Sequence, residues 1–206
     1  MKNKGLSLGL IAVIIVVVVL VVTGFSQYNS IVTMDEKVNT GWANVENQYQ
    51  RRLDLIPNLV ASVKGYAQHE QSTYVGLAEA RSGLQKAYEN AESVNSEIAN
   101  VDEASLRQFQ QAQEKLQSAL GIYVNAVHEA YPELKADKTF LDLMTQLEGT
   151  ENRIAAERTR YNELVNDYNI KVRRFPGAIF AGIFGFSTRA QFRAEAGAES
   201  APKVEF

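Results

Sequence analysis

Residues 31–67 read IVTMDEKVNTGWANVENQYQRRLDLIPNLVASVKGYA. Apolar side chains recur in this stretch at steps of three and four residues. They are Ile31, Met34, Val38, Trp42, Val45, Tyr49, Leu53, Ile56, Val60, Val63 and Ala67. This spacing places them on one face of a long α-helix. Pro57 interrupts the pattern, but the apolar positions resume in phase after it, so we expect a kink rather than a helix end.

Three further stretches carry the same helical pattern. Their apolar positions are Leu77, Ala80, Leu84, Ala87, Ala91, Val94 and Ile98; Leu106, Phe109, Leu116, Leu120, Tyr123 and Val127; and Phe140, Leu143, Leu147, Ile154, Tyr161, Leu164, Tyr168 and Val172. The connections are short, with Asp102 and Asp137 available as helix caps. Because short connections force neighbouring helices to run antiparallel, we expect an all-α fold. Residues 26–174 should form a long bundle of four helices, up-down-up-down.

A strongly apolar stretch precedes the bundle. Residues 6–22 read LSLGLIAVIIVVVVLVV and contain no charged side chain. At 1.5 Å per residue they extend about 25 Å, and adding residues 23–25 brings the length close to that of a bilayer core. A cleaved signal peptide is the alternative, but its apolar part is usually shorter, about 7–15 residues. We therefore expect a retained transmembrane anchor at residues 6–25 after a short cytoplasmic segment at residues 1–5, because Lys2 and Lys4 follow the positive-inside rule.

A second apolar segment follows the bundle. Residues 175–186 read FPGAIFAGIFGF, which is too short to cross a bilayer. An even number of antiparallel helices returns the chain to its starting end, so we expect this segment at the membrane surface. Its lipid-contacting or copy-contacting side chains would be Phe175, Ile179, Phe180, Ile183, Phe184 and Phe186. The alternative is that the segment folds back as a lid on the bundle end.

Charged side chains flank this apolar segment. Arg173 and Arg174 precede it, and Arg189 and Arg193 follow it, as suits anionic lipid head groups. Residues 187–206 are polar and rich in alanine and glutamate, so we expect a mobile tail.

Some charged residues interrupt the apolar stripes. Arg51 and Arg52 in the first helix and Glu151 and Glu157 in the fourth would lie at similar heights in an antiparallel pair. We expect them to form a polar layer that sets the register of the helices, rather than a catalytic site.

The pattern Tyr-Asn-x-x-Val occurs three times. It begins at Tyr28, Tyr161 and Tyr168, and the last two lie seven residues apart. One interpretation is a layer of polar-tipped aromatic side chains near the head groups. We favour the simpler one, in which these are repeated positions on the core seam.

The composition argues against several kinds of chemistry. The chain has no cysteine, which excludes disulfides, cysteine metal sites and thiol nucleophiles. Without the first 24 residues it carries 19 basic and 24 acidic side chains, a net charge of about −5 that disfavours nucleic-acid binding. The two histidines, His69 and His128, each lack the second histidine of a zincin helix. We expect no metal, cofactor or catalytic residue, and a hydrolase built on both histidines is the least favoured alternative.

Several segments together resemble the LemA family over nearly the whole chain. They are Tyr28-Asn29, Trp42, RRLDLIPNLVASVKGYAQHE at 51–70, Ala80-Arg81, YPELKAD at 131–137, Phe140, TENRIAAER at 150–158, RYNELVNDYN at 160–169, Phe175-Pro176 and the final PKVEF. The resemblance implies a membrane-anchored bacterial helical bundle with no assigned enzymatic activity. Because members are often encoded near membrane proteases, it also suggests an envelope protein of that kind as a partner.

These observations lead to two competing functions. The first is a non-enzymatic scaffold of the bacterial cell envelope that self-associates in the inner (cytoplasmic) membrane, with its bundle on the periplasmic or extracellular side. The second is an adaptor or sensor that presents the distal turns, residues 66–73 and 127–137, to another envelope protein. In both cases the lipid bilayer is a partner.

Overall fold

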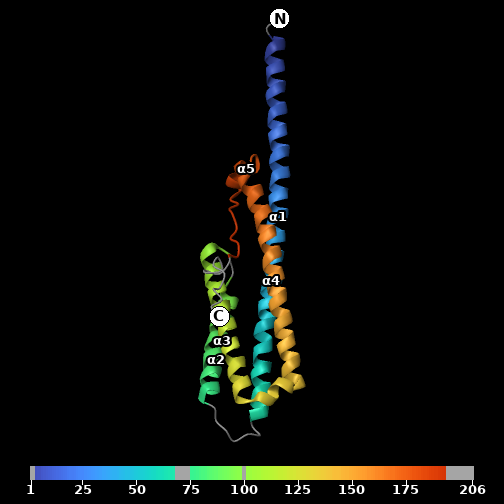
Figure 1. Cartoon of the computed structure of the whole chain (residues 1–206). Coiled ribbons are helices and arrows are strands. Elements are labelled where there is room, and N and C mark those ends of the chain that lie inside the picture. The colour runs from blue at the N-terminus through green and yellow to red at the C-terminus, as the bar shows by residue number, and fades with distance from the viewer. Residues whose placement is uncertain (1–2, 68–74, 99–100, 194–206) are drawn as a thin grey trace, which may run out of the picture. The chain divides into compact units, whose positions relative to one another are not determined.

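The computed structural model describes residues 3–67, 75–98 and 101–193. Its α-helices are α1 (Asn3–Ala67), α2 (Val75–Glu97), α3 (Glu103–Ala130), α4 (Lys138–Arg173) and α5 (Gly177–Phe184), and a 3-10 helix, η1 (Pro132–Ala136), precedes α4 (Figure 1). No β-strand occurs among these residues. The predicted all-α fold, a helical bundle that follows an N-terminal apolar helix, is confirmed.

The chain divides into two compact units. The bundle unit comprises residues 42–162 and 190–206, and the α5 unit comprises residues 1–41 and 163–189. α1 contributes its first part to the α5 unit and the remainder to the bundle unit, and α4 is divided in the same way.

In the bundle unit, α1 and α4 run antiparallel. The ring of Trp42 lies 5.7 Å from that of Tyr161, and ten residues further along α1 the guanidinium of Arg52 pairs with Glu151, ten residues earlier on α4. α1 instead runs parallel to α3, because Trp42 lies beside Phe109, and Arg52, further along α1, binds Gln113, which is further along α3. The sequence pattern predicted this order because every connection between the helices is short.

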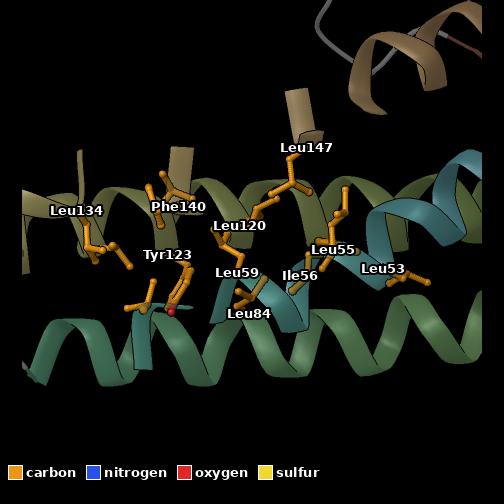
Figure 2. Close-up of a cluster of buried hydrophobic side chains, with 14 of the residues drawn as sticks. Leu53, Leu55, Ile56, Leu59, Leu84, Leu120, Tyr123, Leu134, Phe140 and Leu147 are labelled. Carbon is orange, nitrogen blue, oxygen red and sulfur yellow. The ribbon is translucent and has the colours of Figure 1, made fainter. Parts of the chain in front are cut away.

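Apolar side chains from every bundle helix meet in one core. Leu53 and Leu59 of α1, Leu84 of α2 and Tyr123 of α3 are almost fully buried, and Phe140 of α4 joins them (Figure 2). α1 continues through Pro57 without interruption, as the in-phase apolar stripe predicts. The predicted caps also form. The carboxylate of Asp102 accepts a hydrogen bond from the Ser105 amide (2.7 Å), and that of Asp137 accepts one from the Phe140 amide (2.8 Å).

The core tyrosine Tyr123 makes the stability of the bundle sensitive to alkaline pH. Burial raises the pKa of Tyr123 to about 12, whereas an unfolded tyrosine ionises near about 10. The folded state therefore favours the neutral phenol, so its contribution is fully present below about pH 10 and is lost as the pH rises towards about 12. Urea unfolding midpoints measured from neutral to alkaline pH should fall in that window, and Tyr123→Phe should reduce the slope. An unchanged slope in the variant would contradict this assignment.

In the α5 unit, α1 and α4 bury a small apolar seam. Ile31 and Val38 of α1 and Val165, Tyr168 and Val172 of α4 are all buried in this unit. Further towards the N-terminus the character of α1 changes. Every described residue from 9 to 22 is exposed, although nearly all are apolar. A helix in water would bury one face, so this all-round apolar surface is typical of a helix that lies in lipid.

Candidate membrane-contact surface and buried polar layer

α5 exposes an apolar surface in the α5 unit. The exposed fractions are 77% for Phe175, 54% for Ile179, 67% for Ile183 and 45% for Phe184; these four side chains are here called the α5 face. Sequence analysis also selected Phe180 and Phe186 for this surface, and both are half-buried. The segment therefore has one covered side and one uncovered side.

The covered side packs against α1 close to the end of its apolar run. A Cβ atom at Gly24 would lie 3.2 Å from Cε1 of Phe180, so the two helices approach closely because Gly24 has no side chain. The ring of Tyr28 lies 4.9 Å from that of Phe184 and 5.9 Å from that of Phe186. α5 thus lies beside residues 24–28, where the apolar stretch of residues 6–25 ends.

Two glycines position this short helix. A Cβ atom at Gly177 would overlap the Lys171 carbonyl oxygen, so only glycine allows α5 to begin there. Gly185 ends α5 in the left-handed conformation, with φ of 77°, and the Phe186 amide donates to the Ala181 carbonyl. The chain can therefore turn sharply at both ends of α5.

The arginines around α5 have different surroundings. Arg173 and Arg174 are exposed, and within the described part of the chain neither is joined to a carboxylate by an ion pair. Arg189 instead pairs with Asp35 in the α5 unit, with Nη2 2.9 Å from Oδ1. Arg193 pairs with Glu103 in the bundle unit at 2.7 Å. Of the four predicted head-group ligands, Arg173 and Arg174 are thus the two without an ion pair to a described carboxylate.

The expected mobile tail needs a correction in its first part. Residues 187–193 are extended and tied to the helices, while residues 194–206 lie outside the described residues. In the α5 unit, the Asn169 amide side chain donates to the Arg189 carbonyl (2.9 Å) and accepts from the Arg189 amide (2.8 Å). In the bundle unit, Asn162 forms the same pair of bonds with Phe192, at 3.0 and 2.9 Å.

These bonds explain the second and third occurrences of the Tyr-Asn pattern, all three of which we had interpreted as core positions. Tyr161 and Tyr168 are indeed buried core residues, whereas Tyr28 is 39% exposed, so the core interpretation is wrong for the first occurrence. The side-chain amide of the asparagine that follows each tyrosine donates one hydrogen bond to the backbone of a single residue and accepts one from it. Asn162 binds Phe192 in this way, and Asn169 binds Arg189.

The ring of Phe192 fills an aromatic pocket of the bundle unit. It stacks on Trp42 at 5.9 Å with an interplanar angle of 19°, and meets Tyr161 edge-on at 5.5 Å. The guanidinium carbon of Arg158 lies 4.8 Å from the ring centroid. Phe192 is only 6% exposed, although it stands alone in a polar stretch of sequence. An isolated large aromatic residue in a polar segment was the signal that could have indicated this attachment.

The asparagine bonds give a testable stability effect. Asn162→Ala removes both hydrogen bonds to Phe192 and leaves its backbone groups without these partners, so it should lower the free energy of unfolding by about 1–3 kcal/mol. Asn166 is exposed on the same helix, so Asn166→Ala is a matched control that should change stability much less. Chemical denaturation of both variants checks the prediction. Equal losses for the two variants would contradict a special role for Asn162.

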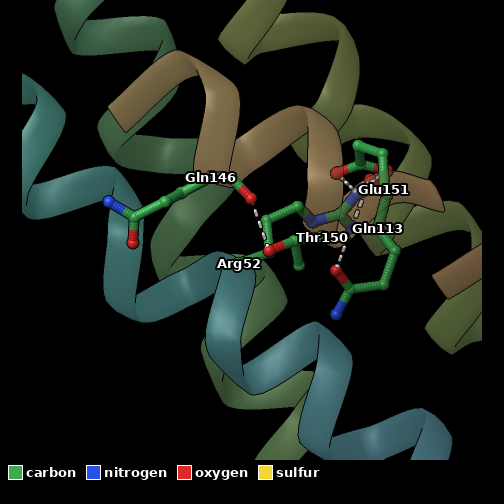
Figure 3. Close-up of polar contacts among 5 residues, drawn as sticks. All are labelled: Arg52, Gln113, Gln146, Thr150 and Glu151. Atoms are coloured by element: carbon green, nitrogen blue, oxygen red, sulfur yellow. Dashed lines mark hydrogen bonds and ion pairs between the residues drawn. The ribbon is translucent and has the colours of Figure 1, made fainter. Parts of the chain in front are cut away.

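A buried polar layer crosses the bundle unit at Arg52. Its side chain is 1% exposed, and Nη1 donates to both oxygens of Glu151, at 2.9 and 3.2 Å (Figure 3). Nη2 donates to Oε1 of Gln113 at 2.5 Å and to the Gln113 carbonyl at 3.3 Å. The layer therefore joins α1, α3 and α4. Such a buried charge is costly unless it is paired, so these contacts favour one register of the three helices.

Four residues were predicted for this layer, and two of them, Arg52 and Glu151, lie together in the structure. Arg51 is exposed, and Glu157 pairs with Arg160 at 2.6 Å on its own helix. Gln113 was missed, although it occupies a gap in the apolar stripe of α3 between Phe109 and Leu116.

A polar cavity of about 280 Å3 adjoins this layer. Gln113 Nε2 and Arg52 Nε have no hydrogen-bond partner among the described residues. A cavity of this size and polarity can hold water molecules that accept bonds from such donors.

The two histidines do not form a site in the described structure. His128 lies in the last turn of α3, with its ring 5.7 Å from that of Phe140. His69 lies outside the described residues. Among the residues that are described, no group of three or more histidine, aspartate or glutamate side chains could hold a metal ion.

The chain is similar to several known proteins. The sequence model of the LemA family matches residues 41–206. The magnetosome proteins MamQ 1 and MamQ 2 of Paramagnetospirillum magneticum are each 29% identical to it over 195 residues, which are 89% of this chain and 71% of the relative. The protein LemA of Metamycoplasma hominis is 23% identical over 147 residues, 71% of this chain and 60% of the relative.

Proposed function

The chain belongs to the LemA family, and we propose that it is a membrane-anchored, non-enzymatic helical scaffold of the bacterial cell envelope that self-associates at the membrane. The observation that carries the proposal is the apolar surface of α1, which is exposed on all sides over residues 9–22. Within the described residues, α1 is the one helix long and apolar enough to cross a membrane. We place it in the inner membrane, with Lys2 and Lys4 on the cytoplasmic side.

The polar groups of the bundle support a structural role. Arg52, the most buried charged side chain described, is bound by Glu151 and Gln113. These bonds connect the helices. They also pair the guanidinium of Arg52 with the carboxylate of Glu151, which suits a structural role better than contact with a substrate. The proposal therefore needs no cofactor and no nucleic acid.

The exposed apolar surface of α1 supports self-association. A helix that is apolar all round can pack against a second copy within the bilayer. Such packing would bring copies together side by side in the membrane.

The mass of the detergent-solubilised protein tests this proposal. The full chain should run above the 22.9 kDa of one copy after correction for detergent. A chain that begins at Ser26 lacks the anchor and should run as a single copy. A full chain of monomer mass would contradict self-association, and equal assembly of both chains would contradict a role for the anchor.

An adaptor is the second candidate. Of the distal turns predicted to make its contacts, residues 68–73 lie outside the described residues, and the observation that favours an adaptor is a groove on the neighbouring helices. A groove of about 790 Å3 lies between α2 and α3, lined mostly by small and apolar side chains that include Leu77, Ala80 and Ala126. Ile122 at this groove is 59% exposed. The groove has room for a helix of another envelope membrane protein, such as a membrane protease.

Site-specific crosslinking separates the adaptor from the scaffold. A photocrosslinker at Ile122 should capture one identified envelope protein, while the same group at exposed Glu148 on α4 should not. Capture of only a second copy of the chain from Ile122 would contradict the adaptor.

A further inference from the structure

We propose that the α5 face, together with Arg173 and Arg174, is a second membrane contact that binds the anionic head groups of the bilayer spanned by the anchor. This inference rests on the proposed anchoring of α1 and names the partner of the α5 face. The occupant is a lipid surface carrying phosphate groups.

The position of α5 along α1 supports this assignment. Phe180 packs on Gly24, and Phe184 packs on Tyr28, at the carboxyl end of the apolar run of residues 6–25. If residues 6–25 span the hydrocarbon core, then residues 24–28 reach its boundary with the head groups. α5 has eight residues and is about 12 Å long, which suits a helix lying at that boundary but not one crossing it.

The exposed side chains of α5 suit the same location. Phe175 and Ile183 are each more than two-thirds exposed, while the opposite side of the segment, at Gly177 and Ala181, is buried. The exposed apolar side chains of the α5 face therefore lie next to α1, whose own apolar residues 9–22 are also exposed. Tyr28, 39% exposed beside Phe184, is the kind of aromatic residue that is enriched at membrane interfaces.

The charges around α5 select for anionic lipid. Residues 168–193 contain five basic side chains and no acidic one: Lys171, Arg173, Arg174, Arg189 and Arg193. Arg173 and Arg174 are exposed directly before Phe175, and within the described residues no ion pair joins either of them to a carboxylate. Guanidinium groups bind phosphate oxygens with two parallel hydrogen bonds, so they favour phosphate head groups that carry net negative charge.

The same charges disfavour a second copy as the occupant. In a symmetric dimer, the same patch meets itself, so Arg173 and Arg174 of one copy would approach those of the other. Because residues 168–193 supply no carboxylate, nothing in this segment would neutralise the four guanidinium groups. An anionic bilayer neutralises them directly.

Because the chain contains no cysteine, a single introduced cysteine can be labelled without competing labelling at other positions. A single cysteine at position 183 (Ile183→Cys) is labelled with an environment-sensitive fluorophore, and the full chain is reconstituted into lipid nanodiscs. One set of discs contains phosphatidylcholine alone, and the other an equal mixture with phosphatidylglycerol. Lipids with a spin label near the head group quench a fluorophore at the interface, and a label at exposed position 148 (Glu148→Cys) serves as the control site.

We expect strong quenching at position 183 and more of it in discs with phosphatidylglycerol. The double variant Arg173→Gln, Arg174→Gln should lower the ratio of docked to undocked α5 by about thirtyfold at low salt. The matched variant Arg107→Gln, Arg153→Gln removes the same charge from the bundle unit and should leave that ratio unchanged. Co-elution of protein and lipid confirms separately that the anchor inserts.

Two outcomes would overturn the proposal. The first is an inserted protein whose label at position 183 is not quenched in either lipid. The second is a label that reports contact with a second copy instead, seen as energy transfer between differently labelled chains in one disc without quenching by the spin-labelled lipid. A protein that fails to co-elute with lipid would contradict the anchor itself, so the two failures are distinguishable.

Discussion

Replacing Phe192 with alanine is expected to lower the free energy of unfolding of the bundle unit by about 3–5 kcal/mol. The ring is 6% exposed and packs on Trp42, Tyr161 and Arg158, so its removal leaves a cavity and frees the extended segment. Because Trp42 is the single tryptophan of the chain, its emission reports this site without labelling. In the variant we expect a shift of that emission to longer wavelength, as water reaches the indole.

Phe175→Ala is the matched control for this experiment. It removes the same ring from a position that is 77% exposed, so both the stability of the bundle unit and the Trp42 emission should change little. If Phe192→Ala and Phe175→Ala had equal effects, the aromatic pocket around Phe192 would not hold residues 190–193 to the bundle unit.

Glu151→Ala is expected to destabilise the bundle unit by a similar amount, about 3–5 kcal/mol. The substitution leaves the guanidinium of Arg52, which is 1% exposed, buried without its carboxylate partner. Adding Arg52→Met should recover most of the loss, because an apolar side chain of similar length needs no partner there. Chemical denaturation of the wild type and the two variants measures both effects.

Glu157→Ala provides the comparison. Its partner Arg160 is mostly exposed, and such a pair contributes about 1 kcal/mol or less. A cost for Glu151→Ala no larger than that for Glu157→Ala would show that the buried layer contributes little to stability.

Much of the fold follows from the spacing of apolar residues. The stripe from Ile31 to Val63 predicted the face that α1 buries, and the caps Asp102 and Asp137 lie where the capping pattern placed them. These features depend on interactions between residues close in sequence, so they can be predicted from the sequence alone. The uninterrupted apolar run of residues 6–22 is visible for the same reason.

The polar layer was predictable only in part. Helical spacing distinguishes its arginines, because Arg52 follows Tyr49 by three residues and precedes Ile56 by four, whereas Arg51 falls off that face. Spacing does not separate Glu151 from Glu157, since both lie three residues from Ile154. The choice depends on which carboxylate faces Arg52 across the helices, and this is a property of the tertiary packing.

The attachment of residues 187–193 could not be predicted from periodicity. An extended segment held by Asn162 and Asn169 has no repeat of its own, because the helix supplies the side chains and the segment supplies backbone groups. Composition therefore indicated a tail. The paired Tyr-Asn motifs were visible, but their purpose depends on a partner about 20–30 residues away in sequence.

One disulfide measurement tests whether the apolar segment after α4 returns to the anchor. Cysteines introduced together by Tyr28→Cys and Phe184→Cys should form a disulfide readily on mild oxidation of intact membranes, because the two native rings lie 4.9 Å apart. A pair made by Ile14→Cys and Phe184→Cys, with the first cysteine about 21 Å further along α1, should remain reduced. A disulfide that forms preferentially between positions 14 and 184, or no disulfide between positions 28 and 184, would show that α5 does not lie at the membrane boundary beside α1.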